Sequence, residues 1–148
     1  MPSFRLLCLC ILMVSACADD PMAVRKSYMD AYESRFDSAA DAVSDISRNC
    51  PRYISVHSDI VAADRVGQDA ALKAYREAES ATVLAYVNRR SSDLILKLAD
   101  KAVQNRCFSE ADYLYDVMLR SAGDPLLRER ARQKKSEALV LRDSAPRR

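Results

Sequence analysis

The sequence predicts an all-α protein, an antiparallel helical hairpin stack or bundle of about five to six helices. Its apolar residues recur at three- and four-residue intervals, the period of a helix, and no segment alternates convincingly as a half-buried strand does. There are only two glycines, Gly67 and Gly123, and Asp-Pro pairs at 20–21 and 124–125 are typical helix starts. Short links between the helices favour antiparallel neighbours.

The first helix is predicted to begin at Pro21, capped by Asp20, and to run to about Arg48. Its apolar stripe comprises Val24, Tyr28, Tyr32, Phe36, Ala39, Val43 and Ile46. Pro51 disfavours helical backbone at the preceding residue, so we expect the chain to turn at Cys50. Cys50 would then lie at a helix end, within reach of another element.

The next two helices are predicted on either side of Gly67. The second helix covers about 52–65 and has a less regular pattern, with the interruption placed near Gly67. The third covers about 68–88, and its apolar side carries Leu72, Tyr75, Ala78, Val83, Tyr86 and Val87.

Two further helices are predicted from their cap signals. The run Ser-Ser-Asp at 91–93 is interpreted as the cap of a fourth helix, which carries Leu94, Ile95, Leu98 and Ala102. A tight turn at 106–108 leads to Ser109, which forms an approximate capping box with Asp112 and opens the fifth helix.

A sixth helix follows Gly123, begins at Asp124-Pro125 and reaches about Arg142, so that a helical domain spans 21–143 and a basic tail spans 144–148. Its weak candidate partner-binding residues are Arg128, Arg130, Arg132, Lys134 and Lys135. Such a surface suits anionic lipid headgroups, an acidic protein or the cell wall. Basic residues late in a terminal helix also suit the helix dipole without any partner, which is the simpler interpretation.

Part of the chain, from about 92 to 125, resembles the tetratricopeptide repeat. The resemblance rests on Leu98-Ala99, Ala102, Ala111 and Tyr115, followed by Asp124-Pro125. In that family small residues let two antiparallel helices approach, and a proline begins the next unit. The early Trp is missing, Ala102 stands in place of a Tyr, Met118 replaces a small residue, and the proline is displaced by about two positions. The resemblance implies a tetratricopeptide-repeat-like hairpin, although any tight helical hairpin produces similar spacings.

The N-terminus has the pattern of an export signal. Residues 1–5 carry one positive charge, and an unbroken apolar run at 6–14 is too short to span a bilayer. Val14-Ser15-Ala16-Cys17 follows it and resembles the lipobox of bacterial lipoproteins. The resemblance implies a cleaved signal peptide at 1–16, a diacylglycerol on Cys17 and a lipid-anchored N-terminus at 17–20. Ala16-Cys17-Ala18 also fits a general signal peptidase, so ordinary secretion is the alternative.

The same resemblance implies a place in the bacterial cell envelope, lipid-anchored to a membrane and facing the periplasm. Ala18 after the cysteine favours the outer membrane over the inner, by analogy with enterobacterial sorting. Asp19 and Asp20 could signal retention at the inner membrane in other bacteria.

The cysteine count predicts one disulfide. Cys8 and Cys10 leave with the signal and Cys17 takes lipid, so the domain keeps Cys50 and Cys107. Two thiols in an oxidising compartment indicate a pair, and two buried free thiols are the alternative. Closing this loop would stabilise the fold by roughly 4 kcal/mol in the chain-entropy model.

Few residues carry recognisable chemistry. The single histidine, in His57-Ser58-Asp59, does not form a catalytic triad because adjacent helical residues point about 100° apart. We expect His57 to be partly exposed or locally hydrogen-bonded. A zinc site is not expected, since it would need Cys50 and Cys107 as free thiols and has no supporting ligand spacing. No cofactor motif is found.

Charge and aromatic content narrow the class of partner. Removal of Arg5 from the 23 basic residues leaves 22 against 21 acidic ones, so nucleic acid is not expected to be a partner. Tyr28, Tyr32, Tyr75, Tyr86, Tyr113 and Tyr115 are candidates for a peptide-binding groove, with core packing as the default interpretation.

The expected function is that of a membrane-anchored envelope lipoprotein, which acts as a protein-interaction adaptor or assembly factor for another envelope protein. A small envelope enzyme or enzyme inhibitor is one alternative, and a structural or lipid-binding helical bundle is another. Because the sequence contains no catalytic motif, an enzyme is not expected.

Overall fold

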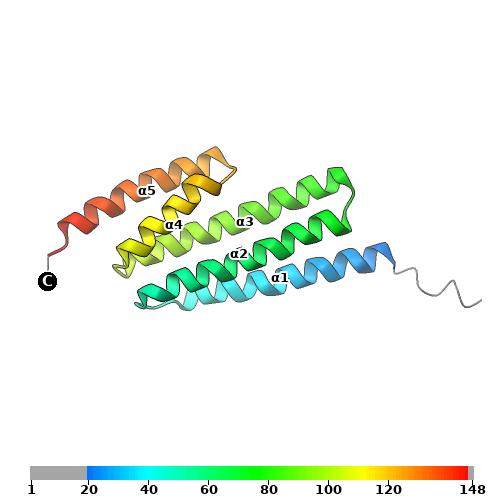
Figure 1. Ribbon diagram of the computed structural model, residues 1–148, viewed down its shortest axis with the longest axis horizontal. Coiled ribbons are helices and arrows are strands. Elements are labelled where there is room, and N and C mark those ends of the chain that lie inside the picture. Colours follow the sequence, from blue (N-terminus) through cyan, green and yellow to red (C-terminus); the bar gives the residue numbers. More distant parts are fainter. Residues whose placement is uncertain (1–19, 147–148) are drawn as a thin grey trace, which may run out of the picture.

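The computed structural model describes residues 20–146 as a stack of five antiparallel helices (Figure 1). They are α1 (Pro21–Asp45), α2 (Cys50–Ala74), α3 (Glu77–Gln104), α4 (Phe108–Ser121) and α5 (Pro125–Ser144). These residues contain no strand, and the predicted all-α class is confirmed. Within 20–146, none of the helices combines the length and the apolar composition that a membrane span requires. Cys17 and the predicted signal peptide lie outside the described residues.

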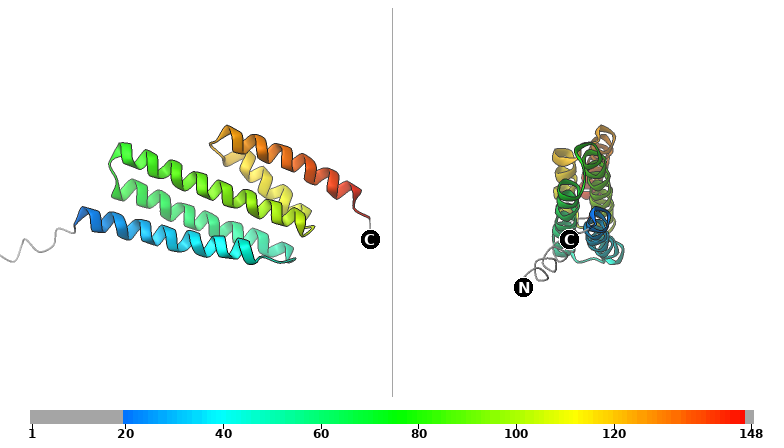
Figure 2. Two further views of the ribbon diagram at one scale, coloured as in Figure 1. Left: turned by 180° about the vertical axis from the view of Figure 1, so that it is seen from behind. Right: turned by 90° about the vertical axis from the view of Figure 1, so that its right-hand side faces the viewer.

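The helices form two layers, because each helix packs against its sequence neighbours and also touches the helix after next. The end-on view shows α1, α3 and α5 on one side and α2 and α4 on the other (Figure 2). The core between the layers is lined by fully buried side chains, among them Tyr32, Tyr53, Ile60, Val87, Leu98, Leu114, Tyr115 and Met118.

Two of the predicted helix starts are confirmed in detail. The Asp20 carboxylate accepts a hydrogen bond from the Met22 backbone N–H at 3.1 Å, and α1 begins at Pro21. At the start of α5, Asp124 accepts from the Leu126 N–H at 2.9 Å. Each carboxylate satisfies a backbone donor that the first turn of a helix leaves without a partner.

The break predicted near Gly67 is wrong, because α2 runs through this residue without interruption. Gly67 is buried where three helices meet, and a Cβ built on it would lie 2.7 Å from Val87 Cγ1 and 2.8 Å from Tyr32 Cδ2. The glycine therefore permits a close helix approach instead of a turn. The actual link lies at 75–76, where the Ser80 hydroxyl donates to the Ala71 carbonyl oxygen.

A helix start at 91–93 is also wrong, since α3 continues through these residues. Ser91 is buried, and its hydroxyl donates to Asp64 Oδ1 on α2 at 2.8 Å. This serine joins two helices and caps neither. With one predicted break moved and the other absent, the six expected segments become five helices.

The turn between α3 and α4 differs slightly from the prediction. Arg106 adopts a left-handed conformation with φ of 59°, and the Cys107 N–H donates to the Ala102 carbonyl oxygen at 2.8 Å. The helix then begins at Phe108, so Ser109 lies inside α4 and does not cap it. A hydrogen-bonded αL residue of this kind ends the preceding helix sharply.

The hairpin that resembles a tetratricopeptide repeat comprises the second half of α3 and the whole of α4. Its small residues Ala99, Ala102 and Ala111 are fully buried in the core. The first helix of this unit does not begin near residue 92, as the repeat pattern would require, because it is the continuation of the 28-residue α3.

Candidate functional site

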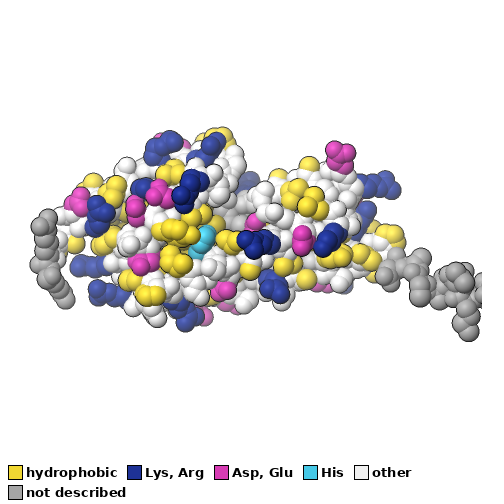
Figure 3. Space-filling model, in the orientation of Figure 1, with side chains coloured by type: hydrophobic (Ala, Val, Ile, Leu, Met, Phe, Trp, Pro, Cys, Tyr) yellow, Lys and Arg dark blue, Asp and Glu magenta, His cyan; other side chains and the backbone are white. Residues whose placement is uncertain are grey.

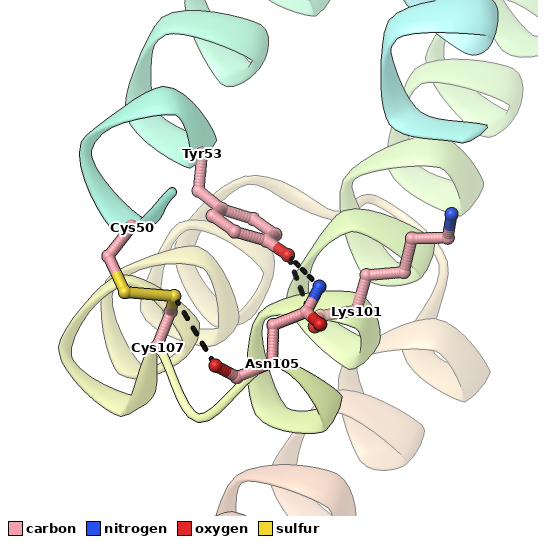
Figure 4. Close-up of a disulfide and its surroundings, with 5 residues drawn as sticks. All are labelled: Cys50, Tyr53, Lys101, Asn105 and Cys107. Atoms are coloured by element: carbon pink, nitrogen blue, oxygen red, sulfur yellow. Dashed lines mark hydrogen bonds between the residues drawn. A yellow bond between two sulfur atoms is a disulfide. The ribbon is translucent and has the colours of Figure 1, made fainter. Parts of the chain in front are cut away.

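A disulfide between Cys50 and Cys107 joins the start of α2 to the residue before α4, as predicted (Figure 4). The two Cα atoms are 5.2 Å apart. Beside it, the Tyr53 hydroxyl donates to the Lys101 carbonyl oxygen at 3.2 Å and accepts from Asn105 Nδ2 at 2.6 Å. One end of α2 is therefore fixed both to the end of α3 and to the α3–α4 turn.

The sulfur atoms of this disulfide also lie close to the Glu110 carboxylate. A metal site would need thiolate ligands, and disulfide sulfurs are neither thiols nor thiolates. The 3.8 Å approach of Cys107 Sγ to the Asn105 carbonyl oxygen is accordingly a packing contact, because a disulfide sulfur carries no hydrogen to donate.

His57 lies about two helical turns along α2 from the disulfide and packs against α4. Its ring meets Tyr113 edge-on, with centroids 5.6 Å apart and an interplanar angle of 82°. The prediction of a partly exposed or locally hydrogen-bonded histidine is wrong: His57 is 8% exposed, and its buried Nε2 has no hydrogen-bond partner among the described residues. Burial lowers the pKa of His57 and so favours the neutral ring.

Leaving a buried nitrogen without a partner costs about 1–3 kcal/mol. Most buried polar groups in folded proteins are hydrogen-bonded, so this nitrogen is an exception. The neighbouring residues do not supply the partner, since the Ser58 hydroxyl donates to the Ile54 carbonyl oxygen and Asp59 is exposed. The sequence triplet at 57–59 thus forms no triad in space.

The unequal lengths of the helices leave a cleft beyond His57. The 14 residues of α4 extend for roughly 21 Å, whereas the 25 of α2 and the 28 of α3 extend for roughly 38 and 42 Å. Because α4 shares a layer with α2 and diverges from it, α3 forms the floor between them (Figures 1 and 2). Figure 3 shows the histidine in cyan at this surface, bordered by hydrophobic side chains and a hollow.

This hollow, here called the α2–α4 cleft, has a volume of about 420 Å³. A second hollow of about 350 Å³ extends it toward the α4–α5 link, and the two share Asn88, Ser92 and Ser121. The polar lining of the first comprises His57, Asp64, Gln68, Asn88, Ser91, Ser92 and Ser121, and its apolar lining comprises Ile60, Val61, Ile95 and Val117. Hollows of this size accommodate a small ligand or a few residues of a peptide.

Asp64 of α2 is the one carboxylate among the described residues that line the cleft, and its neighbours hold it. Asp64 Oδ1 accepts from the Ser91 hydroxyl at 2.8 Å, and Oδ2 accepts from Gln68 Nε2 at 2.5 Å. Two other polar side chains of the lining, those of Asn88 and Ser92, have no hydrogen-bond partner within 20–146. The cleft therefore presents unpaired amide and hydroxyl groups around a carboxylate that is already engaged.

The predicted basic patch is only partly available to a partner. Lys134 Nζ lies 2.6 Å from Asp100 of α3, and Lys135 Nζ lies 2.6 Å from Asp116 and 3.2 Å from Asp112 of α4. The pKa of Lys135 is raised by its hydrogen bond to Asp116, against a smaller effect of burial. Both lysines therefore hold α5 against its neighbours.

The remaining three basic residues of the patch are exposed. Arg132 pairs with Glu129 on the same helix, while Arg128 and Arg130 have no ion-pair partner among the described residues. Arg128 and Arg130 are the part of the predicted patch that faces outward.

The tyrosines proposed for a groove do not gather in one place. Tyr32 and Tyr115 are buried, and burial raises the pKa of Tyr32 to about 12. Tyr86 lies on α3 and donates from its hydroxyl to Glu33 of α1 at 3.1 Å. Tyr113 contacts His57 beside the cleft. Core packing and interhelical contacts therefore account for most of this set.

Sequence reasoning also missed a clamp between α1 and α3. The Arg90 guanidinium stacks over the Phe36 ring at 4.0 Å and pairs with Glu33 at 2.5 Å. The available signal was the pair of Tyr32 and Phe36 on the first predicted stripe, with the acidic Glu33 directly after Tyr32 in the sequence. The clamp fixes α1 on the layer opposite the cleft.

No family model matches the chain, and no curated protein or solved structure matches it significantly. The interpretation of the α2–α4 cleft therefore depends on its own geometry.

Proposed function

We propose that this protein is a lipid-anchored adaptor of the bacterial cell envelope, and that it holds another envelope protein close to a membrane through the α2–α4 cleft. The observation that carries the adaptor role is the cleft itself. Its exposed amide and hydroxyl groups, set among apolar side chains, are suited to binding a ligand more than to transforming one.

The Cys50–Cys107 disulfide supports a location in an oxidising compartment. It also suits the adaptor role, because it fixes α2 and α4 at the closed end of the cleft. The disulfide fixes α2 relative to α4 at this end, and so limits how far the two helices can move apart at the open end. A preorganised site of this kind loses less conformational entropy when its ligand binds.

The anchor is proposed from the lipobox-like residues that end at Cys17. Two residues separate Cys17 from Asp20, the cap of α1. With so short a connection, the helical stack would begin at the membrane surface. Confinement to that layer raises the effective concentration of the cleft toward membrane-bound partners. Stable anchoring needs more than one acyl chain. The lipoprotein resemblance implies that the mature N-terminus carries more than one.

Metabolic labelling with a fatty-acid analogue tests the anchor. We expect label on the wild-type chain and none on Cys17→Ser, which instead would be recovered in the soluble envelope fraction. A chain without label that begins at Asp19 would contradict the anchor.

Co-purification from detergent-solubilised envelopes tests the adaptor role. We expect a stoichiometric protein partner with the wild-type chain and with Ser136→Phe, an exposed substitution on α5. Ser92→Phe, which fills the cleft, should lose that partner. Equal recovery with both variants, or no partner with the wild type, would contradict the proposal.

A further inference from the structure

The carboxylate that lines the α2–α4 cleft has no cationic partner. Asp64 is half-buried, and its two oxygens accept hydrogen bonds from Gln68 Nε2 and the Ser91 hydroxyl. Both donors are neutral, so they orient the carboxylate without compensating its charge. No Lys or Arg within residues 20–146 forms an ion pair with it. The cleft therefore contains an uncompensated negative charge.

The cleft and the hollow that extends it carry a net negative charge. In the extension toward the α4–α5 link, Arg89 and Asp124 contribute one charge of each sign. Burial lowers the pKa of His57 and favours its neutral ring. The described residues that line both hollows thus carry two negative charges, from Asp64 and Asp124, against one positive charge from Arg89. This balance disfavours an anionic ligand.

The free energy needed to cover Asp64 depends on the charge of the ligand. A ligand that enters the cleft removes water from this half-buried carboxylate, and an uncharged ligand supplies no opposite charge in return. A cation offsets the lost hydration with an ion pair. A carboxylate accepts about four hydrogen bonds, and Asp64 receives two from the described residues, so acceptor sites remain for the N–H groups of a cation.

Further acceptors and apolar side chains surround the carboxylate. The Ser121 hydroxyl donates to the Val117 carbonyl oxygen at 2.7 Å, which leaves its oxygen as an acceptor, and Asn88 and Ser92 add two more oxygens to the lining. Val61 of α2 and Val117 of α4 are partly exposed on opposite walls. A lysine or arginine side chain matches this lining, because its stem is apolar and its cationic head only donates hydrogen bonds.

From these observations we infer that the α2–α4 cleft binds a lysine or arginine side chain of the partner protein, whose cationic head pairs with the Asp64 carboxylate. The apolar stem of that side chain packs between Val61 and Val117. The inference deepens the proposed function and rests on it, because the basic side chain belongs to the envelope protein that the adaptor holds.

The binding test uses the full chain purified in mild detergent and a phage-displayed library of random linear peptides. Selected peptides are then synthesised with a terminal tryptophan, whose fluorescence reports binding because the chain contains no tryptophan. We expect the selected sequences to share a lysine or an arginine. Replacement of that lysine by acetyl-lysine, or of the arginine by citrulline, removes the charge and should raise the Kd about tenfold or more. Added salt should also raise the Kd of the basic peptides, because it screens the ion pair.

Two variants that remove the same charge locate the ion pair. Asp64→Asn keeps an acceptor for Ser91 and an amide that can pair with Gln68, so it should raise the Kd of the basic peptide about tenfold and leave that of its acetyl-lysine or citrulline analogue unchanged. Asp59→Asn removes a charge from an exposed position on the same helix, outside the cleft, and should change neither Kd.

Thermal unfolding shows whether Asp64→Asn is folded. If it is not, Ser121→Phe takes its place, because this substitution narrows the cleft from an exposed position at the end of α4. The comparison of the charged and uncharged peptides on the wild-type chain needs no variant at all.

Three results would overturn the inference. These are failure to select any peptide with a basic residue, equal affinity of the wild-type chain for the charged and uncharged peptides, and binding of free spermidine as tight as that of the basic peptides. The last result would assign the cleft to a small polyamine. Failure here is distinguishable from failure of the proposed function. If Asp64→Asn keeps the envelope partner in co-purification while Ser92→Phe loses it, the adaptor role stands and only the basic side chain is wrong.

Discussion

The Ser91 hydroxyl on α3 donates a 2.8 Å hydrogen bond to Asp64 on α2, at the floor of the α2–α4 cleft. Ser91 is 5% exposed, so this bond is largely shielded from water. It joins the two helices that form the floor and one wall, and it occupies one oxygen of the only carboxylate there. The position of this carboxylate at the cleft thus depends on a serine inside a helix.

The first prediction concerns this bond. Ser91→Ala should lower the free energy of unfolding by about 1–3 kcal/mol, because it leaves a half-buried carboxylate oxygen of Asp64 without its donor. Urea denaturation followed by circular dichroism measures the change. Ser58→Ala is the control, since Ser58 is exposed and donates only within its own helix. Equal stability of the two variants would mean that the Ser91–Asp64 bond contributes nothing.

A second prediction separates packing from helix propensity at Gly67. Alanine is favoured over glycine in a helix by about 1 kcal/mol, yet the new Cβ would meet Val87 and Tyr32 at under 3.0 Å. Overpacking of a core typically costs about 1–3 kcal/mol, so we expect Gly67→Ala to be neutral or destabilising.

Gly123 provides the matched control for this substitution. A Cβ on Gly123 has no atom within 4 Å, and its φ is not positive. Gly123→Ala should therefore stabilise the protein by about 0.4–1 kcal/mol through the unfolded state. Thermal unfolding of both variants decides the matter, and a stabilised Gly67→Ala protein would contradict the close approach of α1, α2 and α3.

The third prediction concerns the disulfide. Cys50→Ser combined with Cys107→Ser should lower the free energy of unfolding by up to roughly 4 kcal/mol. It should also weaken binding of the envelope partner, because α2 and α4 would no longer be tied at the closed end of the cleft. Alkylation of the unfolded wild-type chain without reductant should leave both residues unmodified. Modification of either cysteine under these conditions would contradict the disulfide.

The fourth prediction is a pH dependence of stability from His57. Burial lowers the pKa of His57 below its usual value of 6.5, so the unfolded chain binds this proton more readily than the folded one. The contribution of neutral His57 to the free energy of unfolding is complete at pH values above the pKa of this residue in the unfolded chain. It is lost as the pH falls through and below about 6.5. Asp64 is the charged residue that lines the cleft together with His57, and it accepts hydrogen bonds from Gln68 of α2 and Ser91 of α3. Tyr113 of α4 packs against the His57 ring.

Unfolding curves between about pH 7.5 and pH 5 measure this effect. The loss of stability on acidification should be smaller in His57→Phe than in the wild type. If the two proteins lose the same free energy over this range, His57 is not the group responsible.

The sequence predicted the helical class and two helix starts because these depend on local chemistry. Asp20 and Asp124 each precede a proline, and the cap that they form needs only the next turn of the chain. The pairing of Cys50 with Cys107 followed from counting thiols after the others were assigned to the signal and the lipid. These features require no knowledge of how the helices pack.

Gly67 and Ser91 were misinterpreted for the same physical reason. A glycine that ends a helix and a glycine that lets two helices approach have the same local signature, and only Val87 and Tyr32 distinguish them. A serine that caps a helix likewise resembles one that bonds across to Asp64. Tertiary packing decides both cases, and one sequence does not display it.

The cleft was beyond prediction because it arises from unequal helix lengths. His57 becomes buried only when α4 lies against α2, and the hollow exists because α4 ends beside the middle of α3. The sequence interpretation divided the region of α2 and α3 into three predicted helices. It therefore missed that these two helices are much longer than α4.

The central claim is that the α2–α4 cleft holds an envelope partner, and photo-crosslinking in living cells tests it most directly. A photoreactive amino acid placed at Asn88, at the exposed edge of the cleft, should yield one dominant crosslinked protein. The same group at Ser136 on α5 should not, and the crosslink from Asn88 should disappear when Ser121→Phe is added. An identical pattern of products from both positions, or a crosslink from Asn88 that Ser121→Phe leaves unchanged, would contradict the account.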